Sequence, residues 1–425
     1  MSIVLRGFVF SALAFLFSCT PSPERTDIPM PWESARDTSS VKLDQTELGD
    51  RVLGAIVGSA IGDAMGASTE MWYRKDIQAQ YGYITELTTA LREKSAEGTW
   101  RHNMVAGSTT DDTRWKVLMG DYINQHRGEL STDHFAAFIT DYYEDRVTAL
   151  ADAQTKKSTD VLDERIEQLN WIKEWARVTM AYQQGTTAFL AAQHRFYGGE
   201  MSCAGMLYSP VFGLVAASPE EAYLAGIEHA LFDLGYARDI TGLVAAITNK
   251  ALQTSNVDSL LAIHQYIDPY GYQDARLIGR LSVQMLQEAQ VMVQQARTLE
   301  VSEAAPLVIP EGFPGTAADW LQEQYLFEEL EKRQKAIPFH AGEIWQILVT
   351  GLLYGAGDFE KTMTFIVNYG RDNDTVAAVA GMILGAALGY DQLPDDWKTQ
   401  TIEVSKEVMG LDLEMLAKKI LVDIR

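Results

Sequence analysis

The hydrophobic residues of this chain recur at spacings of three and four in nearly every segment after residue 50. Long examples lie at residues 134–153, 161–185 and 275–299. This spacing places apolar side chains on one face of an amphipathic helix. The alternation typical of strands is almost absent apart from a weak candidate at residues 83–87, and no hairpin signal is visible. The pattern therefore predicts an all-α folded body.

Two stretches of small apolar residues depart from the amphipathic pattern. In both, glycine recurs every four residues: Gly54, Gly58, Gly62 and Gly66 in the first, and Gly381, Gly385 and Gly389 in the second. Residues four apart share a helix face, and glycine lets another backbone approach that face closely. The second run, 376–389, has 14 residues without a charge, which is too short to span a bilayer. We expect two buried helices that can pack on each other.

An acidic cluster precedes the helical pattern at each of two distant places. The first cluster is Thr110, Asp111 and Asp112, and the second is Asp372, Asp374 and Thr375. Either cluster alone could be an ordinary helix N-cap. A helix start needs only one or two hydrogen-bond acceptors, however, and each cluster offers two aspartates as well as a threonine. Because the clusters look like halves of one site, we expect a single domain that brings both ends of the body together.

The chemistry of these side chains predicts a site for hard cations. Carboxylate and hydroxyl oxygens suit Mg²⁺, Mn²⁺ or Ca²⁺ and do not suit zinc or copper. Four neighbouring carboxylates would repel each other, and two divalent ions would neutralise them almost completely. The calcium-loop pattern fails after Asp372, because the required fifth-position Asn or Asp, the sixth-position Gly and the terminal Glu are missing. A cysteine-based zinc site is also excluded, since Cys203 is the one cysteine after Cys19.

Composition narrows the class of protein further. The chain has 425 residues, and 47% of them are hydrophobic, which is enough for a sizeable core. Fifty-eight acidic residues against 35 basic ones give a formal charge of -23. A protein so negative would repel a phosphate backbone, so we expect no nucleic-acid partner.

The N-terminus predicts export. Arg6 precedes an apolar stretch at residues 7–17, which ends at Ser18 and Cys19. The order Leu-Phe-Ser-Cys resembles a bacterial lipobox, in which cleavage leaves a lipid-bearing Cys19; the alternative is an ordinary signal peptide with an incidental cysteine. Thr20 follows and no Asp stands there, which by resemblance to Gram-negative lipoproteins favours the outer membrane.

This gives three predicted segments. Residues 1–18 are a lipoprotein signal peptide. Residues 19–48, rich in Pro, Ser, Thr and charge, form a flexible tether. Residues 49–425 form one folded domain, because none of the turn-like stretches inside it looks like a linker.

Three motifs of the body resemble the ADP-ribosylglycohydrolase family, which includes enzymes that remove ADP-ribose from arginine and serine and the dinitrogenase-reductase-activating glycohydrolase. They are GAIVGSAIGDAMGASTE at 54–70, STTDDT at 108–113, and the closing stretch 357–389 that contains RDNDTVAAVAG. The resemblance implies an all-α orthogonal bundle that holds two Mg²⁺ ions, or Mn²⁺ in their place. It assigns the metal ligands to Thr110, Asp111, Asp112, Asp372, Asp374 and Thr375.

The resemblance also implies a mechanism. The metals would bind the ribose hydroxyls and orient or activate a water for attack at the anomeric carbon, while nearby carboxylates stabilise an oxocarbenium-like state. Glu70 and Asp112 are the catalytic candidates. Glu70 matches a position where some members place a catalytic or metal-adjacent Glu, and the alternative is a surface acid just past a helix. Asp63 is expected to support helix packing or hydrogen bonds behind the site.

The chain departs from the family pattern beside the expected metals. Where many members have a Thr-His pair, Asp233 and Tyr236 occupy the region, and His229 is expected to be structural. Arg371 replaces the small residue commonly found before the first Asp of the closing motif. We expect Asp233, Tyr236 and Arg371 to contact substrate. Arg371 could pair with a ligand phosphate or carboxylate, or form a salt bridge with an acid such as Asp233.

Together these features predict a metal-dependent hydrolase of an N- or O-glycosidic bond to ribose, anchored by lipid at a bacterial envelope. Its substrate would be a small-molecule or protein-linked ribosyl group. Two alternatives stay open. The enzyme could act on a different glycoside or nucleoside, or the protein could bind metal and nucleotide without catalysis.

Overall fold

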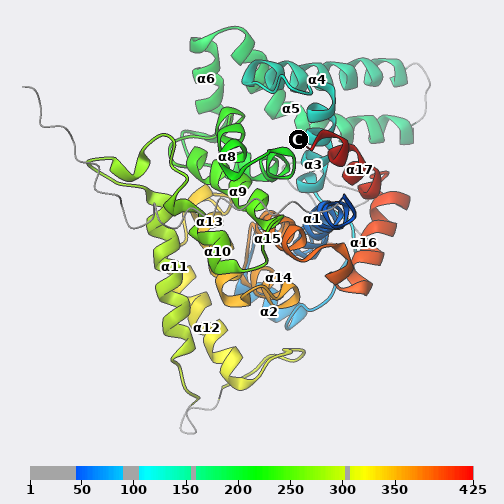
Figure 1. The fold of residues 1–425 in the computed structure, drawn as a ribbon. Coiled ribbons are helices and arrows are strands. Elements are labelled where there is room, and N and C mark those ends of the chain that lie inside the picture. The colour runs from blue at the N-terminus through cyan, green and yellow to red at the C-terminus, as the bar shows by residue number, and fades with distance from the viewer. Residues whose placement is uncertain (1–44, 90–104, 155–158, 302–306, 425) are drawn as a thin grey trace, which may run out of the picture. The chain divides into compact units, whose positions relative to one another are not determined.

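The computed structural model describes residues 45–89, 105–154, 159–301 and 307–424. Contacts divide the chain between residues 38 and 39, and all described residues belong to the second unit. The predicted signal peptide, Cys19 and residues 20–44 of the predicted tether lie outside the described residues. The described part is all-α, as predicted (Figure 1).

The elements have the following bounds. The helices are α1 (Gln45–Gly66), α2 (Arg74–Tyr81), α3 (Asp111–Gln125), α4 (Thr132–Gln154), α5 (Thr159–Gln183), α6 (Thr186–Tyr197), α7 (Pro210–Val215), α8 (Pro219–Glu228), α9 (Ala237–Ala251), α10 (Val257–Leu261), α11 (Leu281–Arg297), α12 (Ala317–Glu331), α13 (Ala341–Gly355), α14 (Phe359–Tyr369), α15 (Asn373–Leu388), α16 (Asp395–Glu407) and α17 (Leu413–Asp423). The 3₁₀ turns are η3 (Ala204–Leu207), η4 (Ala262–Gln265), η5 (Tyr272–Asp274) and η6 (Tyr390–Gln392). The strands are β1 (Trp72–Tyr73) and β2 (Gly370–Arg371).

The predicted helices at 134–153 and 161–185 are confirmed as α4 and α5, and the one at 275–299 is confirmed in part as α11, which begins only at Leu281. Helix α1 starts at Gln45, so residues 45–48, expected to belong to the tether, are helical. An ion pair between Arg51 and Glu47, one turn apart, supports this first part of the helix.

Helices α1 and α15 lie side by side at the centre of the described unit, although they come from opposite ends of the chain (Figure 1). Their glycine faces meet, as the spacing predicted. A Cβ atom added to Gly58 would lie 2.4 Å from the carbonyl oxygen of Gly381, and one added to Gly385 would lie 2.0 Å from that of Gly54. Backbones in such close contact leave no room for any side chain.

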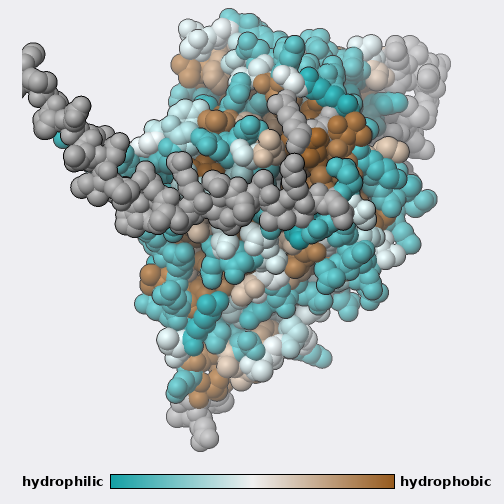
Figure 2. Space-filling model, viewed as in Figure 1, coloured by the Kyte–Doolittle hydropathy of each residue, from teal (hydrophilic) through white to brown (hydrophobic). Residues whose placement is uncertain are grey.

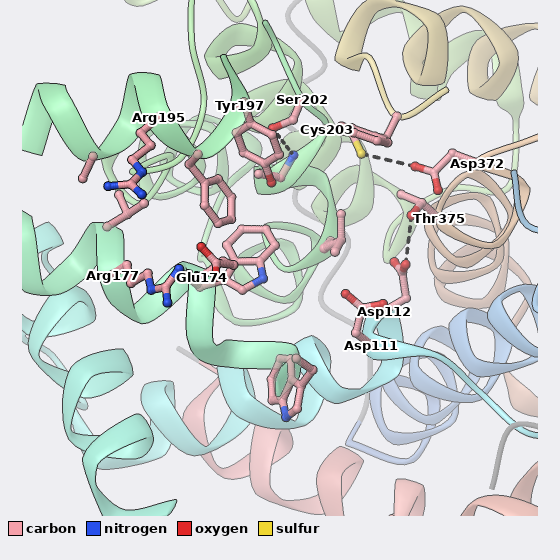
Figure 3. Close-up of a pocket in the computed structure, with 18 of the residues that line it drawn as sticks. Asp111, Asp112, Glu174, Arg177, Arg195, Tyr197, Ser202, Cys203, Asp372 and Thr375 are labelled. Atoms are coloured by element: carbon pink, nitrogen blue, oxygen red, sulfur yellow. Dashed lines mark hydrogen bonds and ion pairs between the residues drawn. The ribbon is translucent and has the colours of Figure 1, made fainter. Parts of the chain in front are cut away.

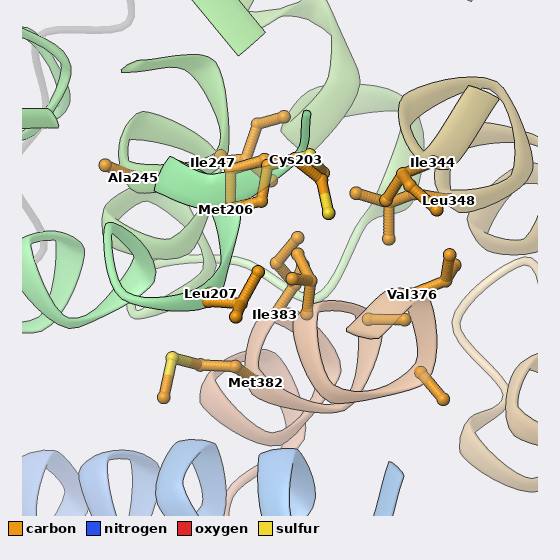
Figure 4. Close-up of a cluster of buried hydrophobic side chains, with 14 of the residues drawn as sticks. Cys203, Met206, Leu207, Ala245, Ile247, Ile344, Leu348, Val376, Met382 and Ile383 are labelled. Carbon is orange, nitrogen blue, oxygen red and sulfur yellow. The ribbon is translucent and has the colours of Figure 1, made fainter. Parts of the chain in front are cut away.

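The remaining helices enclose this pair. Helix α15 is buried along almost its whole length, and it packs against α14, α13, α9 and η3. Figure 4 shows side chains from these elements meeting over α15, among them Met206 and Leu207 of η3, Ile344 of α13 and Ile383 of α15. On the other side, α1 contacts α3, α16 and α17.

The molecular surface differs from this apolar centre. Figure 2 shows polar residues over most of the visible face, with apolar side chains in smaller groups between them. None of the helices in the described ranges combines the length and the hydropathy that a membrane crossing requires.

A short antiparallel ribbon joins segments that are far apart in the sequence. Trp72 of β1 pairs with Arg371 of β2, and Tyr73 pairs with Gly370. The strand candidate at residues 83–87 is wrong, because these residues lie in neither a helix nor a strand. The side-chain amide of Asn368 accepts from Ile84 N at 2.8 Å and donates to Ile84 O at 2.9 Å. It thus replaces a partner strand.

The glycine contact can be tested within helix α1. Gly58→Ala should lower the free energy of unfolding by about 3 kcal/mol, because the new methyl group would force α1 and α15 apart. Gly49→Ala is the matched control: its Cβ would meet only Leu421 Cδ1, at 3.8 Å, and alanine should gain about 0.5 to 1 kcal/mol through helix propensity. Urea unfolding followed by circular dichroism measures both. Equal effects of the two substitutions would refute the close backbone contact.

Candidate functional site

A cavity of about 1380 Å³ opens beside the first turns of α3 and α15. One end of it is acidic. The residues at that end are Glu70, Asp111, Asp112, Asp372, Asp374 and Thr375. Figure 3 shows Asp112 and Asp372 on either side of Thr375, with Asp111 next to Asp112. The structure therefore brings the two predicted clusters together in one site.

The helix pair and the β1–β2 ribbon place Glu70 against the second cluster. A Cβ on Gly66, the last residue of α1, would lie 2.3 Å from Asp374 Cα. Five residues later, Met71 N donates to Arg371 O at 2.6 Å. Met71 and Arg371 have φ values of 64° and 65°, a left-handed conformation that costs a non-glycine residue about 1 to 3 kcal/mol. The strained residues directly flank Glu70 and Asp372.

Three carboxylates converge closely enough to share a cation. One oxygen from each of Glu70, Asp372 and Asp374 lies within 4.8 Å of the other two. Oxygens on opposite sides of a Mg²⁺ ion are about 4.2 Å apart, twice the usual metal–oxygen distance of about 2.1 Å. The donor set and its spacing therefore fit a hard divalent ion after small side-chain movements.

Asp112 joins this cluster from helix α3. Its Oδ2 accepts a hydrogen bond from Thr375 Oγ1 at 2.9 Å, and its Oδ1 accepts from Lys116 Nζ at 2.9 Å. Both members of the Lys116–Asp112 ion pair are 2% exposed. The Thr375 bond links the first turns of α15 and α3. Lys116 was not identified from the sequence, although it stands four residues after Asp112 on a predicted helix, where the two side chains share a face.

Asp63 supports the site from behind, as expected. Its carboxylate accepts from Thr110 N at 2.8 Å, Thr113 N at 2.9 Å and Thr113 Oγ1 at 2.6 Å. Complete burial, together with the negative charges of Asp112 and Asp374, raises its pKa to about 7. Asp63 thereby fixes the start of α3 on α1.

The predicted ligands Thr110 and Asp111 differ in their positions. The Thr110 hydroxyl accepts from Asp112 N at 3.2 Å and caps helix α3; Thr110 does not belong to the cavity wall. Asp111 does line the cavity. A metal-ligand role remains a prediction for both, and the geometry favours Asp111.

Asp233 and Tyr236 lie outside the cavity wall. Asp233 accepts from Gly205 N at 2.9 Å and from Thr241 Oγ1 at 2.6 Å, and burial raises its pKa. It holds turn η3, which begins next to Cys203. Tyr236 precedes α9 and stands beside Gly342. Neither residue lines the cavity, so their contact with substrate stays a prediction, and Asp233 supports the backbone of Gly205.

Arg371 is engaged in a buried ion pair. Its Nε donates to Glu343 Oε1 at 2.5 Å and its Nη2 to Glu343 Oε2 at 3.2 Å, and Nη2 also donates to the carbonyl of Lys335 at 2.9 Å. Arg371 is not part of the cavity wall. Of the two interpretations of this residue, the geometry favours the salt bridge, with Glu343 as the partner in place of Asp233.

Cys203 touches the acidic cluster. Its Sγ lies 3.4 Å from Asp372 Oδ2, and burial, reinforced by the charge of Asp372, raises the pKa of the thiol well above its usual value. The thiol therefore stays protonated, which agrees with its expected role as a small buried residue. His229 is also structural: burial lowers its pKa to about 4, and Tyr122 OH lies 3.0 Å from its Nε2.

The far end of the cavity has a different character. Helices α5 and α6 supply aromatic and basic residues there, namely Trp171, Trp175, Arg177, Arg195 and Phe196. Figure 3 places Arg177 and Arg195 across the cavity from the acidic cluster. Arg177 also pairs with Glu174 at 2.6 Å. These residues were not identified from the sequence, because their helical spacing is the same as that of ordinary core residues.

Comparisons with known proteins agree with this architecture. The sequence model of the ADP-ribosylglycohydrolase family matches residues 44–425. The ADP-ribosyl-[dinitrogen reductase] glycohydrolase of Rhodospirillum rubrum is 23% identical over 365 residues, which cover 84% of this chain and 93% of that protein. Uncharacterized protein YegU of Escherichia coli (strain K12) is 30% identical over 93 residues, 22% of this chain. That second match spans 27% of YegU.

Solved structures show the same fold. An ADP-ribosylglycohydrolase-related protein complex aligns with a TM-score of 0.50 at 18% identity, covering 89% of this chain and 100% of that chain. At this identity the likeness concerns the fold alone.

The role of Arg371 is open to a direct test. Arg371→Met should lower the free energy of unfolding by about 3 to 5 kcal/mol, because Glu343 would remain buried without its cation. The double variant Arg371→Met/Glu343→Leu should recover much of that loss. Denaturant unfolding measures stability, and calorimetry with ADP-ribose measures binding. Unchanged stability together with weakened binding would instead identify Arg371 as a ligand contact.

Proposed function

The chain belongs to the ADP-ribosylglycohydrolase family, and from this premise we propose that it is a divalent-metal-dependent hydrolase of an N- or O-glycosidic bond to ribose. The observation that carries the proposal is the convergence of Glu70, Asp372 and Asp374 within 4.8 Å at one end of a large cavity. Mg²⁺ is the expected ion, with Mn²⁺ as a substitute, because all three donors are hard oxygens.

The metal ion and the site side chains would have separate roles in the hydrolysis. A bound divalent ion supplies Lewis acidity toward ribose hydroxyls and water. Glu70 is partly exposed at the cavity wall, so its carboxylate can accept a proton from the attacking water. Asp112 presents negative charge toward the same space, where an oxocarbenium-like state would develop positive charge.

The rest of the cavity supports a substrate larger than ribose. Ligand sites typically enclose about 300 to 1,000 Å³, and this cavity of about 1380 Å³ exceeds that range. Trp171 and Trp175 offer aromatic surface, and Arg177 and Arg195 offer guanidinium groups that suit phosphate. We therefore propose a nucleotide-linked ribose, such as an ADP-ribosyl group, in preference to a bare nucleoside. The name of the Rhodospirillum rubrum relative supports the same substrate class.

The test is release of ADP-ribose from ADP-ribosyl-arginine and ADP-ribosyl-serine, compared with hydrolysis of unmodified nucleosides, and measured by mass spectrometry. Release should require Mg²⁺ or Mn²⁺ and stop with a chelator. Asp374→Asn should slow it by about 100-fold or more, because a lost carboxylate ligand removes several kcal/mol of charge stabilisation. Asp395→Asn, at a surface position that is 90% exposed, is the control.

Two results would contradict parts of this proposal. Turnover that is insensitive to the chelator would refute metal dependence. Metal and ADP-ribose binding without any turnover would instead support a member of the family that has lost catalysis.

We also propose that the protein is anchored at the bacterial envelope through Cys19, on the strength of the Leu-Phe-Ser-Cys sequence after the apolar stretch. The native protein should fractionate with membranes and carry acyl mass on an N-terminal Cys19 when its intact mass is measured. Cys19→Ser should abolish both. Recovery of a wild-type soluble periplasmic form without acyl groups would overturn the proposal.

A further inference from the structure

Lys116 places a positive charge inside the acidic site. Its side chain is 2% exposed, and its Nζ lies 2.9 Å from Asp112 Oδ1. Burying an ammonium group costs several kcal/mol unless a partner compensates. The similarly spaced pair Arg51–Glu47 is different, since its side chains are 18% and 48% exposed and it belongs to the surface. The burial of this positive charge next to Asp112 therefore points to an electrostatic role for Lys116 within the site.

Apart from Asp111, the carboxylates of the site fall into two groups. Glu70, Asp372 and Asp374 converge on one point. Asp112 stands apart from that group, because its two oxygens are already bonded to Lys116 and Thr375. One group is arranged for an added cation, and the other already has a cation that belongs to the chain.

We propose that Lys116 takes the charge-neutralising place of a second divalent ion. The protein then holds one divalent ion tightly at Glu70, Asp372 and Asp374, and an ion at Asp112 only weakly. This inference rests on the proposed metal-dependent function, and it departs from the two ions expected from the sequence.

Electrostatics gives the reason. An ion bound to Asp112 Oδ1 would lie within roughly 5 Å of Lys116 Nζ, from the 2.9 Å hydrogen bond plus a metal–oxygen distance of about 2.1 Å. Repulsion between a divalent ion and an ammonium group at that distance is strong, because the Lys116–Asp112 pair is only 2% exposed and solvent screens it little. The same ammonium group balances Asp112 when no ion is there, so Asp112 does not need one.

The test counts bound ions directly. Metal-free wild-type protein is titrated with Mn²⁺ by calorimetry and by the electron paramagnetic resonance signal of free Mn²⁺. One ion should bind tightly, with any second ion at least about tenfold weaker. Lys116→Met keeps an unbranched side chain that is one atom shorter and removes its charge, so it should bind two ions with the second affinity raised at least about tenfold. Circular dichroism checks that the variant is folded.

A second variant keeps the proposal testable if Lys116→Met does not fold. Asp112→Asn should retain the one tight ion, because the tight site does not depend on Asp112, whereas Asp374→Asn should lose it. Loss of the tight ion in Asp112→Asn would overturn the role of Lys116. The role of Lys116 would also be overturned if the wild type bound two ions with similar affinity, or if a folded Lys116→Met protein still bound a single ion. Either result would leave the proposed function intact. Absence of any Mn²⁺ binding would overturn both.

Discussion

The backbone contact between α1 and α15 is the constraint on which the site depends. Both helices present glycine at every fourth position, so their axes approach until carbonyl oxygens of one lie where side chains of the other would stand. Such a contact fixes the position of one helix along the axis of the other as well as the distance between the two axes. The end of α1 at Gly66 is thereby held against Asp374 at the start of α15. Glu70, four residues later, reaches the same point. Residues from opposite ends of the chain become neighbours because of packing, before any ligand is considered.

Gathering so many carboxylates opposes folding, and the surroundings offset the repulsion in several ways. Asp112 and Asp374 stand in the first turns of α3 and α15, where the partial positive charge of a helix N-terminus favours anions. Asp63 receives three hydrogen bonds from the start of α3, and Lys116 pairs with Asp112. Glu70, Asp372 and Asp374 converge within 4.8 Å of one another beside these groups. Under the proposed function, the negative charge that they bring together is what would favour binding of a cation.

The sequence predicted the parts of the molecule that depend on local patterns. Helical periodicity identified α4, α5 and α11, glycine spacing identified the α1–α15 contact, and the acidic clusters identified both halves of the site. What the sequence did not predict depends on contacts between distant segments. The β1–β2 ribbon is two residues long on each side, which is too short to show alternation. The Arg371–Glu343 pair joins strand β2 to the first turn of α13, and no local pattern signals it. The amide of Asn368 takes the place of the partner strand expected for residues 83–87.

The structure changes the interpretation of two positions where the chain departs from the family pattern. Arg371 directly precedes Asp372, and Asp233 was expected to contact substrate, yet each is bound to protein atoms: Arg371 to Glu343, and Asp233 to Gly205 and Thr241. They hold the backbone around Asp372 and Cys203, so they act on the rigid, acidic end of the cavity. The opposite wall is built on α5 and α6, and Arg177 there is 63% exposed. A side chain at such a wall can change without disturbing the α1–α15 contact, whereas a change at Arg371 would leave a buried charge. Differences in substrate between this protein and its relatives are therefore to be sought on α5 and α6, and the acidic end should keep its chemistry.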